Sequence, residues 1–260
     1  MSATSVTWCG HSTVWLADSG VTLLTDPVLT DRVAHLRRMA GPAPALPGRP
    51  DAVLLSHLHA DHFHLASLRM VPGRPTLIVP RGATAFVAKT MGPSYASRCV
   101  ELAPGEATMV GPVRVRAVPA AHDGGRGPWS RARALAIGFV VEGAARTWFA
   151  GDTGLFDEMN DIGPLDLALV PVGGWGPTLG EGHLDAARGA EALRRVKASW
   201  AVPIHYGTLW PIGMGRVRSH MFHTPGARFA EAAAQVVPGV QVRVLTQGET
   251  LTIDPIGRPA

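Results

Sequence analysis

Short apolar runs separated by polar or glycine-rich residues recur along the chain and predict a protein built on buried strands. Continuous apolar runs are typical of strands that are covered on both faces. These runs lie at residues 52–55, 76–79, 136–141, 147–150, 167–170 and 200–204. Residues 113–118 instead read Val-Arg-Val-Arg-Ala-Val, which predicts a strand with one face in water. Residues 14–16 and 21–25 predict an opening hairpin around a turn at 18–20.

Helical periodicity appears between several of these runs. The predicted helices cover residues 65–70, 83–90, 184–197 and 225–235. Asp185 is the expected N-cap of the third helix, although Gly189 weakens that helix, and Pro225 suits the first turn of the fourth. Residues 30–50 are rich in Pro, Gly and Arg without a period and predict a loop over the surface or the site mouth.

Strands followed by helices recur in both halves of the 260 residues, and residues 242–245 and 251–253 suggest a closing hairpin around Gln247-Gly248. This order predicts an α/β (α+β) fold in which a duplicated β-rich layer is flanked by helices. We expect one domain over residues 1–260, made of two pseudo-repeated halves that meet near residue 130.

The densest chemistry follows the apolar run at 52–55. His57, His59, Asp61 and His62 are all metal ligands by type, and they occupy the loop after that predicted strand. Residues 57, 59 and 61 share one side of an extended segment, whereas His62 must turn away, so the group divides between two neighbouring ions. The alternative is an ordinary solvated polar loop.

Three further apolar runs also end in a residue that can bind metal. His122 follows residues 113–118, Asp152 follows 147–150, and His205 follows 200–204. Strands that are parallel or share an edge bring their carboxyl ends to one line, so these side chains are expected to meet the His57 cluster.

Several other residues keep two interpretations. His11 either faces the site or satisfies backbone groups, and Asp26 either holds the far ring nitrogen of a ligand histidine or caps a turn. His35 is expected to be solvated, and His64 is left outside the ligand set. His220 and His223 have no assigned role.

Composition limits the class of protein. Hydrophobic residues make up 46% and charged residues 17% of the chain, which indicates a globular protein. No apolar run is long enough for a membrane span and residues 1–10 lack a signal peptide, so a cytoplasmic location is expected. Cys9 and Cys99 form no ligand spacing and are expected to be reduced. The arginines are scattered, so no nucleic-acid partner is expected, but Arg126, Arg131 and Arg133 could receive an anionic group.

Taken together, these motifs resemble the metallo-β-lactamase superfamily. The features concerned are the HxHxDH string at 57–62, the later His122, the Gly151-Asp152 pair and the final His205. The chain is most similar to the branch that contains ascorbate-phosphate lactonases and N-acyl-phosphatidylethanolamine phospholipase D. The matching stretches are residues 8–13, 25–27, 56–62, 150–154, 165–171, 182–185 and 203–208. The resemblance implies a four-layer αββα sandwich with its site along the shared edge of two sheets.

The resemblance also implies roles for these residues. One ion would be bound by His57, His59 and His122, the second by Asp61, His62 and His205, and Asp152 would bridge both. Nitrogen and oxygen ligands suit two divalent ions, Zn²⁺ first, with Mn²⁺ or Fe as alternatives. Such ions can hold a bridging hydroxide as the nucleophile.

Further side chains are expected to serve the reaction directly. Asp61 and His183 are the candidate catalytic residues, and by resemblance His183 would donate to the substrate oxyanion or leaving group. The alternative for His183 is an ordinary histidine at the entry to the following helix. Trp175, Trp210 and Arg126 are the candidate substrate-binding residues, and Trp129 lies in a similar loop. For each tryptophan, packing in the core is the competing interpretation.

Three functions remain open. The first is a binuclear hydrolase of phosphodiesters, which the phospholipase-like stretches and the arginines favour. The second is a lactonase or carboxylic-ester hydrolase, and the third is a catalytically inactive metal-binding protein of the same fold. The expected partner is a small-molecule substrate, and homo-oligomerisation stays open.

Overall fold

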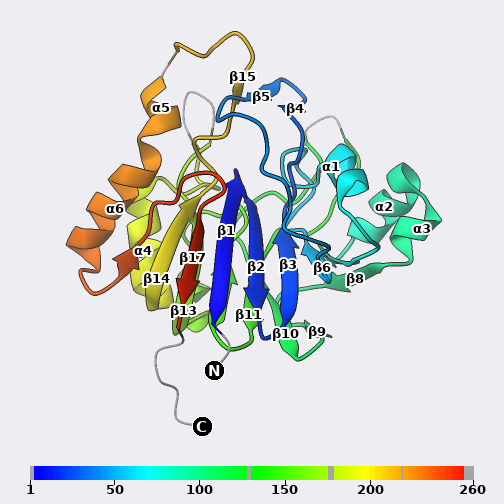
Figure 1. Ribbon diagram of the computed structural model, residues 1–260, viewed down its shortest axis with the longest axis horizontal. Coiled ribbons are helices and arrows are strands. Elements are labelled where there is room, and N and C mark those ends of the chain that lie inside the picture. Colours follow the sequence, from blue (N-terminus) through cyan, green and yellow to red (C-terminus); the bar gives the residue numbers. More distant parts are fainter. Residues whose placement is uncertain (1–2, 128–129, 175–178, 218, 255–260) are drawn as a thin grey trace.

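The computed structural model describes residues 3–127, 130–174, 179–217 and 219–254, which form two large sheets and one small one (Figure 1). The first large sheet has the order β17-β1-β2-β3-β6-β7-β8. Its strands are β1 (Thr4–Gly10), β2 (Thr13–Asp18), β3 (Val21–Thr25), β6 (Ala52–Leu54), β7 (Thr76–Pro80), β8 (Cys99–Leu102) and β17 (Thr250–Ile253). β17, β1, β2 and β3 pair antiparallel, whereas β3, β6, β7 and β8 pair parallel.

The second large sheet repeats this division into an antiparallel and a parallel part. Its order is β16-β14-β13-β12-β11-β10-β9. Its strands are β9 (Ala107–Val110), β10 (Val113–Pro119), β11 (Ile137–Glu142), β12 (Arg146–Phe149), β13 (Leu165–Pro171), β14 (Ala198–Ile204) and β16 (Gln241–Val242). The parallel part runs from β12 to β16, so both sheets offer the carboxyl ends of parallel strands at one edge.

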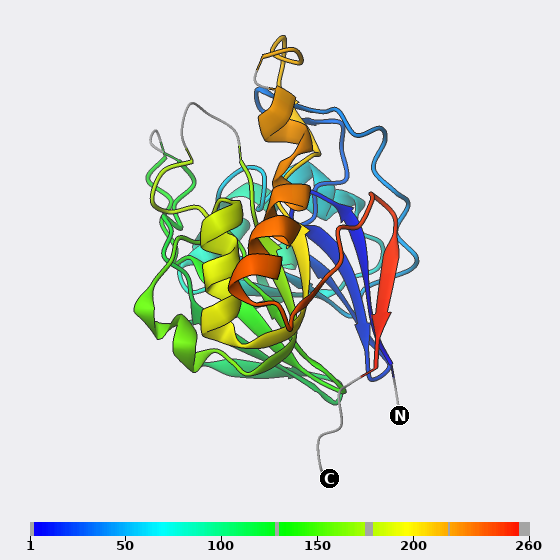
Figure 2. The same ribbon diagram turned by 90° about the vertical axis from the view of Figure 1, so that its left-hand side faces the viewer.

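Helices cover the outer face of each sheet. α1 (Leu65–Met70), α2 (Ala83–Met91) and α3 (Pro93–Ala96) lie on one side of the molecule, and α4 (Ala186–Val196) and α6 (Pro225–Val236) lie on the other (Figures 1 and 2). The short helices α5 (Ser219–His223) and η1 (Asp157–Asp161) complete the set among the described residues. No helix among the described residues is both long and apolar enough to cross a membrane.

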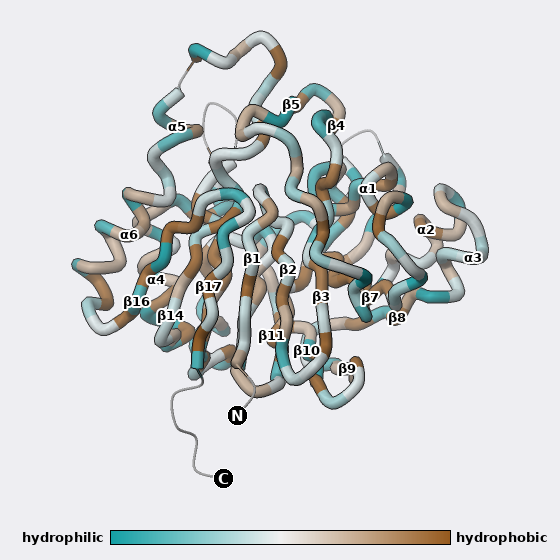
Figure 3. The backbone as a smooth tube through the Cα atoms, viewed as in Figure 1, coloured by the Kyte–Doolittle hydropathy of each residue, from teal (hydrophilic) through white to brown (hydrophobic). Residues whose placement is uncertain are grey.

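Three apolar clusters join these layers. Val6, Leu16 and Leu54 of the first sheet pack against Phe139 and Leu169 of the second, which makes the central core. Separate clusters bind the second sheet to α4 and α6 and the first sheet to α1 and α2. Brown segments lie along β3, β14 and β17 in Figure 3, where the strands supply this apolar surface. The four-layer αββα sandwich expected from the sequence is therefore present.

Local sequence patterns explain individual elements. In β10 the valines are buried while Arg114 and Arg116 turn outward to Glu142, as the alternating pattern predicts. Asp185 caps α4 by accepting a hydrogen bond from the backbone N–H of Arg188, so the predicted N-cap is confirmed.

The glycine inside α4 has a packing reason. A Cβ at Gly189 would lie 3.0 Å from a ring carbon of Phe229 in α6. The close contact of α4 with α6 therefore compensates for the low helix propensity of glycine at this position.

The predicted closing hairpin is wrong. Val242 of β16 pairs with Ala201 in the second sheet, whereas Leu251 of β17 pairs with Val6 in the first. The two last strands lie at the edges of different sheets and do not pair with each other, because each covers the unpaired backbone groups of an edge strand.

The loop predicted over residues 30–50 also needs correction. It contains β4 (Arg32–Val33) and β5 (Leu36–Arg38), which pair with each other, and β5 also pairs with β15 (Leu209–Pro211) to form the small sheet above the strand ends. Val33 and Leu36 are buried against Val28 and Leu209. This hairpin is therefore a fixed part of the site mouth, and we call residues 32–38 the mouth hairpin.

Candidate metal centre and its cavity

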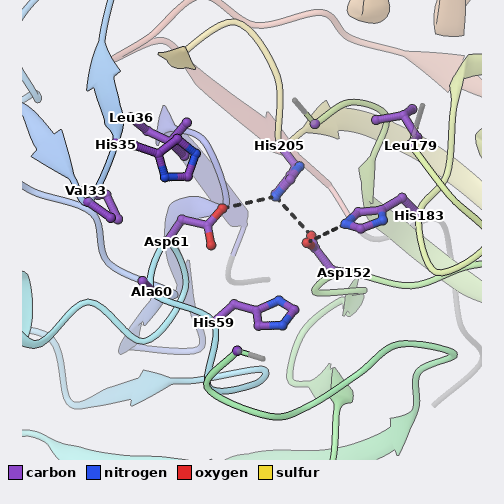
Figure 4. Close-up of a pocket in the computed structure, with 13 residues that line it drawn as sticks. Val33, His35, Leu36, His59, Ala60, Asp61, Asp152, Leu179, His183 and His205 are labelled. Atoms are coloured by element: carbon purple, nitrogen blue, oxygen red, sulfur yellow. Dashed lines mark ion pairs between the residues drawn. The ribbon is translucent and has the colours of Figure 1, made fainter. Parts of the chain in front are cut away.

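The residues predicted from four strand ends meet in one place. His57 follows β6, His122 follows β10, Asp152 follows β12 and His205 directly follows β14. Figure 4 shows Asp152, His183 and His205 pointing toward one another, with His59 and Asp61 beside them. The topology produces this convergence because the parallel parts of both sheets end at the same edge.

A glycine permits the close approach of the β12 and β6 ends. Gly151 has φ +63°, and a Cβ there would lie 2.6 Å from the Cβ of Ser56. Only glycine therefore lets the chain pass here and present Asp152 to the histidine cluster.

The first donor group consists of His57, His59 and His122. His59 Nδ1 lies 3.0 Å from His57 Nε2 and 3.2 Å from His122 Nε2. His59 thus presents its Nδ1 atom, whereas its two neighbours present Nε2. The three nitrogens face a common centre.

The second group lies next to the first. His62 Nε2 is 3.1 Å from His205 Nε2, and Asp61 Oδ2 is 4.0 Å from that same atom of His205. Asp152 stands between the groups, with Oδ2 at 3.2 Å from His62 Nε2 and Oδ1 at 3.2 Å from His205 Nε2. These are the seven residues that the sequence singles out as metal ligands.

Hydrogen bonds on the far side of the rings fix how three of these histidines point. Carbonyl oxygens accept from Nδ1 of His122 at 2.8 Å and of His205 at 2.9 Å. Nδ1 of His62 lies 2.6 Å from the Asp26 carboxylate. In each ring Nδ1 therefore carries the proton, which leaves the lone pair of Nε2 directed into the cluster.

Asp26 and Ser56 extend this support to His57. Asp26 accepts hydrogen bonds from the backbone N–H and the hydroxyl of Ser56, and the Ser56 oxygen lies 2.9 Å from His57 Nδ1. Asp26 is fully buried and contacts a candidate ligand directly, so the geometry favours the ligand-holding interpretation. Ser56 was missed in the sequence, although its place between a strand end and His57 was an available signal.

The charges of the cluster are tightly coupled. Burial keeps the pKa of His57 well below its ordinary value and lowers that of His122 to about 4. Burial also acts to lower the pKa values of His62 and His205, but the neighbouring carboxylate of Asp152 outweighs it and raises both. A cation held by these two rings would balance the same carboxylates.

The donor set fits divalent metal ions. A tetrahedral shell with metal–nitrogen bonds of about 2.0–2.1 Å places its ligand atoms about 3.3 Å apart. The separations of 3.0–3.2 Å between facing nitrogens approach that value. Imidazoles and carboxylates without thiolates suit Zn²⁺, Mn²⁺ or Fe.

His183 lies at the open side of the cluster. Its Nε2 is 3.5 Å from Asp152 Oδ2, its ring centre is 4.8 Å from that of His122, and 32% of its side chain is exposed. It can therefore reach both the cluster and a bound molecule.

A cavity of about 380 Å³ opens over the cluster. His183, Asp61, Asp152, His59 and His205 form its polar side. Its apolar side is formed by Val33, Ala34, Leu36, Ala60 and Leu179. His35, expected to be solvated, is exposed and also lines this cavity. The sequence does not indicate this position, because His35 is far along the chain from the other site residues.

The candidate substrate-binding residues lie in different places. Trp175 and Trp129 fall outside the described residues. Trp210 is buried, donates from Nε1 to the Met214 carbonyl and lines a small neighbouring cavity with His11 and His205.

Arg126 lies beneath the ligand loop. Its guanidinium donates to the carbonyls of Leu58 and Phe63 at 2.9 and 2.7 Å and lies over the ring of Phe86. It is absent from the residues that line the cavity. His64 likewise lies apart from the donor groups, with its Nδ1 2.7 Å from Ser67 Oγ.

An αββα sandwich with such a cluster at its sheet edge defines the class of metallo-β-lactamase-fold proteins. A model of the β-lactamase superfamily domain matches residues 22–206, so the chain belongs to this family. The family and its curated relatives above 30% identity make it a metal-dependent hydrolase.

Known proteins similar to this chain include two curated relatives and one solved structure. A UPF0173 metal-dependent hydrolase of Thermus thermophilus is 31% identical over 258 residues, covering 96% of this chain and 99% of the relative. An N-acyl-phosphatidylethanolamine-hydrolyzing phospholipase D of Caenorhabditis elegans is 30% identical over 230 residues, covering 80% of this chain but 64% of the relative. A metallo hydrolase from Ignicoccus hospitalis has the same fold, with a TM-score of 0.72 at 21% identity, covering 96% of this chain and 98% of that one.

Proposed function

We propose that this protein is a binuclear metal-dependent hydrolase that cleaves phosphodiesters. The observation that carries the proposal is the pair of adjacent donor groups with Asp152 between them. A single ion would leave several buried nitrogens and oxygens of these groups without a partner, which is costly.

The chain's own residues divide into two ligand sets. His57, His59 and His122 would hold one ion, Asp61, His62 and His205 the other, and Asp152 both. When bound, two divalent ions, most naturally Zn²⁺, would supply activated water and polarise the attacked group.

Two side chains at the cavity floor would move protons. The Asp61 carboxylate is 21% exposed and can accept the proton of an attacking water molecule. His183 lies across the cavity and would donate a proton to the departing oxygen. The apolar side of the cavity, which includes the mouth hairpin, would hold the organic substituents and exclude water.

Charge supports an anionic substrate. The two carboxylates of the ligand sets cancel only half the charge of two divalent cations, and the imidazoles add none when they act as ligands. The loaded site would therefore attract a phosphodiester monoanion. The phospholipase D relative, named as a hydrolase of a phospholipid, is consistent with this substrate class.

A second candidate is a carboxylic ester or lactone. No Arg or Lys is among the described residues that line the cavity, so a neutral substrate would lose no ion pair there. The small, largely apolar cavity fits such a molecule as well.

Comparative kinetics separates these candidates. The metal-reconstituted protein is assayed with bis(p-nitrophenyl) phosphate, p-nitrophenyl acetate and a γ-lactone, with Asp152→Ala as the inactive variant and His64→Ala as the matched control. We expect the highest kcat/KM for the phosphodiester and unchanged rates in the control. Faster turnover of the ester or lactone would replace the phosphodiester proposal, and no metal-dependent turnover of any of the three would contradict it.

A further inference from the structure

His11 lies in the turn between β1 and β2, and its imidazole reaches the metal centre from outside the predicted ligand set. It is only 5% exposed, and its ring centre lies 4.2 Å from that of His205 and 5.2 Å from that of His62. It lines the small neighbouring cavity beside Trp210 but not the cavity over the cluster, whereas His205 lines both. The ring therefore approaches the metal centre from the neighbouring cavity.

The backbone of His11, not its ring, makes the local hydrogen bonds. Its N–H donates to Thr208 Oγ1 at 2.7 Å, and its carbonyl accepts from His205 N–H and from Trp8 Nε1, both at 2.9 Å. This removes the alternative that the imidazole is there to satisfy backbone groups. The same hydrogen bonds hold the His11 backbone at φ 51° and fix the position from which its side chain extends.

The contact of the His11 ring with Asp61 has the spacing expected of two ligands of the same metal ion. His11 Nε2 lies 3.3 Å from Asp61 Oδ2, yet it makes no hydrogen bond with well-formed angles to any described residue. Asp152 Oδ1 behaves in the same way at 3.2 Å from His205 Nε2. Two ligands of one ion are separated by about 3.3 Å and point at the ion, not at each other.

We propose that His11 Nε2 is a further ligand of the ion held by Asp61, His62 and His205. The inference rests on the proposed binuclear function. The ligand atoms of these four residues all lie within 4.8 Å of one another, and three of the four residues are buried. Before Asp152 is counted, this ion has four protein ligands, whereas the other has three.

The two ions then have unequal surroundings. The ion with His11 would have one more protein ligand than the ion of His57, His59 and His122, whose ligand His122 lies beside the part-exposed ring of His183. We therefore expect the first metal equivalent to fill the site that contains His11, and the second equivalent to exchange more readily.

The test uses variants matched in backbone conformation. His11 and His205 both have positive φ, at 51° and 62°, where Asn is tolerated better than most residues. His11→Asn and His205→Asn therefore remove an imidazole without adding strain. His64→Asn, outside the donor groups, is the negative control.

Chelator-treated protein is titrated with Co²⁺, followed by equilibrium dialysis and by the hyperfine-shifted proton signals of ligating imidazoles. The wild type should show six ligating imidazoles, His11 added to the five others. His11→Asn should lose one imidazole signal set and bind one ion about 10- to 100-fold more weakly or worse. His64→Asn should match the wild type.

Several results would overturn the proposal. Signals from only five ligating imidazoles in the wild type would exclude His11 as a ligand. This result needs no variant, so it decides the question even if His11→Asn does not fold. Weaker binding by His11→Asn with every wild-type signal retained would make His11 a positioning residue instead. Failure of the binuclear proposal itself is distinguishable, because the wild type would then bind fewer than two ions and His205→Asn would lose none.

Discussion

Replacing Asp26 with Asn should switch the tautomer of His62 and weaken metal binding without changing any predicted ligand. Asp26 accepts three hydrogen bonds, from the Ser56 N–H, the Ser56 hydroxyl and His62 Nδ1, and both of its oxygens are buried. An Asn side chain has one acceptor and one NH₂ group in their place. The NH₂ group cannot face the backbone N–H of Ser56, because two donors would meet there and a peptide N–H cannot change.

The Asn side chain should therefore direct its NH₂ group to His62. The ring can accommodate this contact by moving its proton from Nδ1 to Nε2, and Nε2–H cannot bind a metal ion. Loss of such a supporting carboxylate costs about 10- to 100-fold in metal affinity, or about 1.4–2.8 kcal/mol. In the metal-free protein, the three charge-assisted hydrogen bonds of Asp26, at about 1.5–3 kcal/mol each, are replaced by neutral ones, so the unfolding free energy should also fall.

Chelator competition measures the affinity, and ¹⁵N spectra of labelled histidine report the tautomer. Ser56→Ala is the matched control for the tautomer, since it removes the hydroxyl's contacts with Asp26 and His57 but leaves the His62 contact with Asp26 intact. It should preserve the His62 tautomer. Wild-type affinity for both ions in Asp26→Asn, or a His62 ring still protonated on Nδ1, would refute the reasoning.

Three further predictions follow from the same structure. Asp152→Ala should lower metal content and reduce turnover about 10³-fold or more while the protein stays folded; unchanged turnover would remove Asp152 from the site. His183→Ala should lose about 10²- to 10⁴-fold in kcat but keep both ions, and metal loss would show that it is a ligand. Burial raises the thiol pKa of both Cys9 and Cys99 to about 11, so at pH 8 about one thiol in a thousand is ionised. Both should react with a disulfide reagent only after unfolding or well above pH 8, and rapid reaction of the native protein would contradict this.

The elements that the sequence predicts well are those determined by local pattern. The Val-Arg alternation of β10 and the N-cap at Asp185 each depend on neighbours a few residues away, and both agree with the structure. The strand-end placement of His122, Asp152 and His205 follows from the same local runs. Their convergence could be expected because parallel strands end at one edge, whereas their role as ligands stays a prediction.

The elements that the sequence misses depend on partners far along the chain. The mouth hairpin has too few residues for a period, and it is held by β15, where Trp210 pairs with Arg37. The last two strands look like a hairpin because they are close in sequence, yet Val242 and Leu251 pair in different sheets. Choice of partner is a tertiary property that periodicity does not contain.

The position of Arg126 shows that this arginine does not supply positive charge to the cavity. An arginine near the ligand loop suggests a direct contact with a substrate anion, but its guanidinium is directed to the carbonyls of Leu58 and Phe63. Those carbonyls flank His59 to His62 on both sides, so the arginine stabilises the ligand loop itself. Because the described cavity lining contains neither Arg nor Lys, attraction for an anion must come from the bound ions. Affinity for a phosphodiester should consequently disappear with the metal, whereas a site built on arginine would retain it.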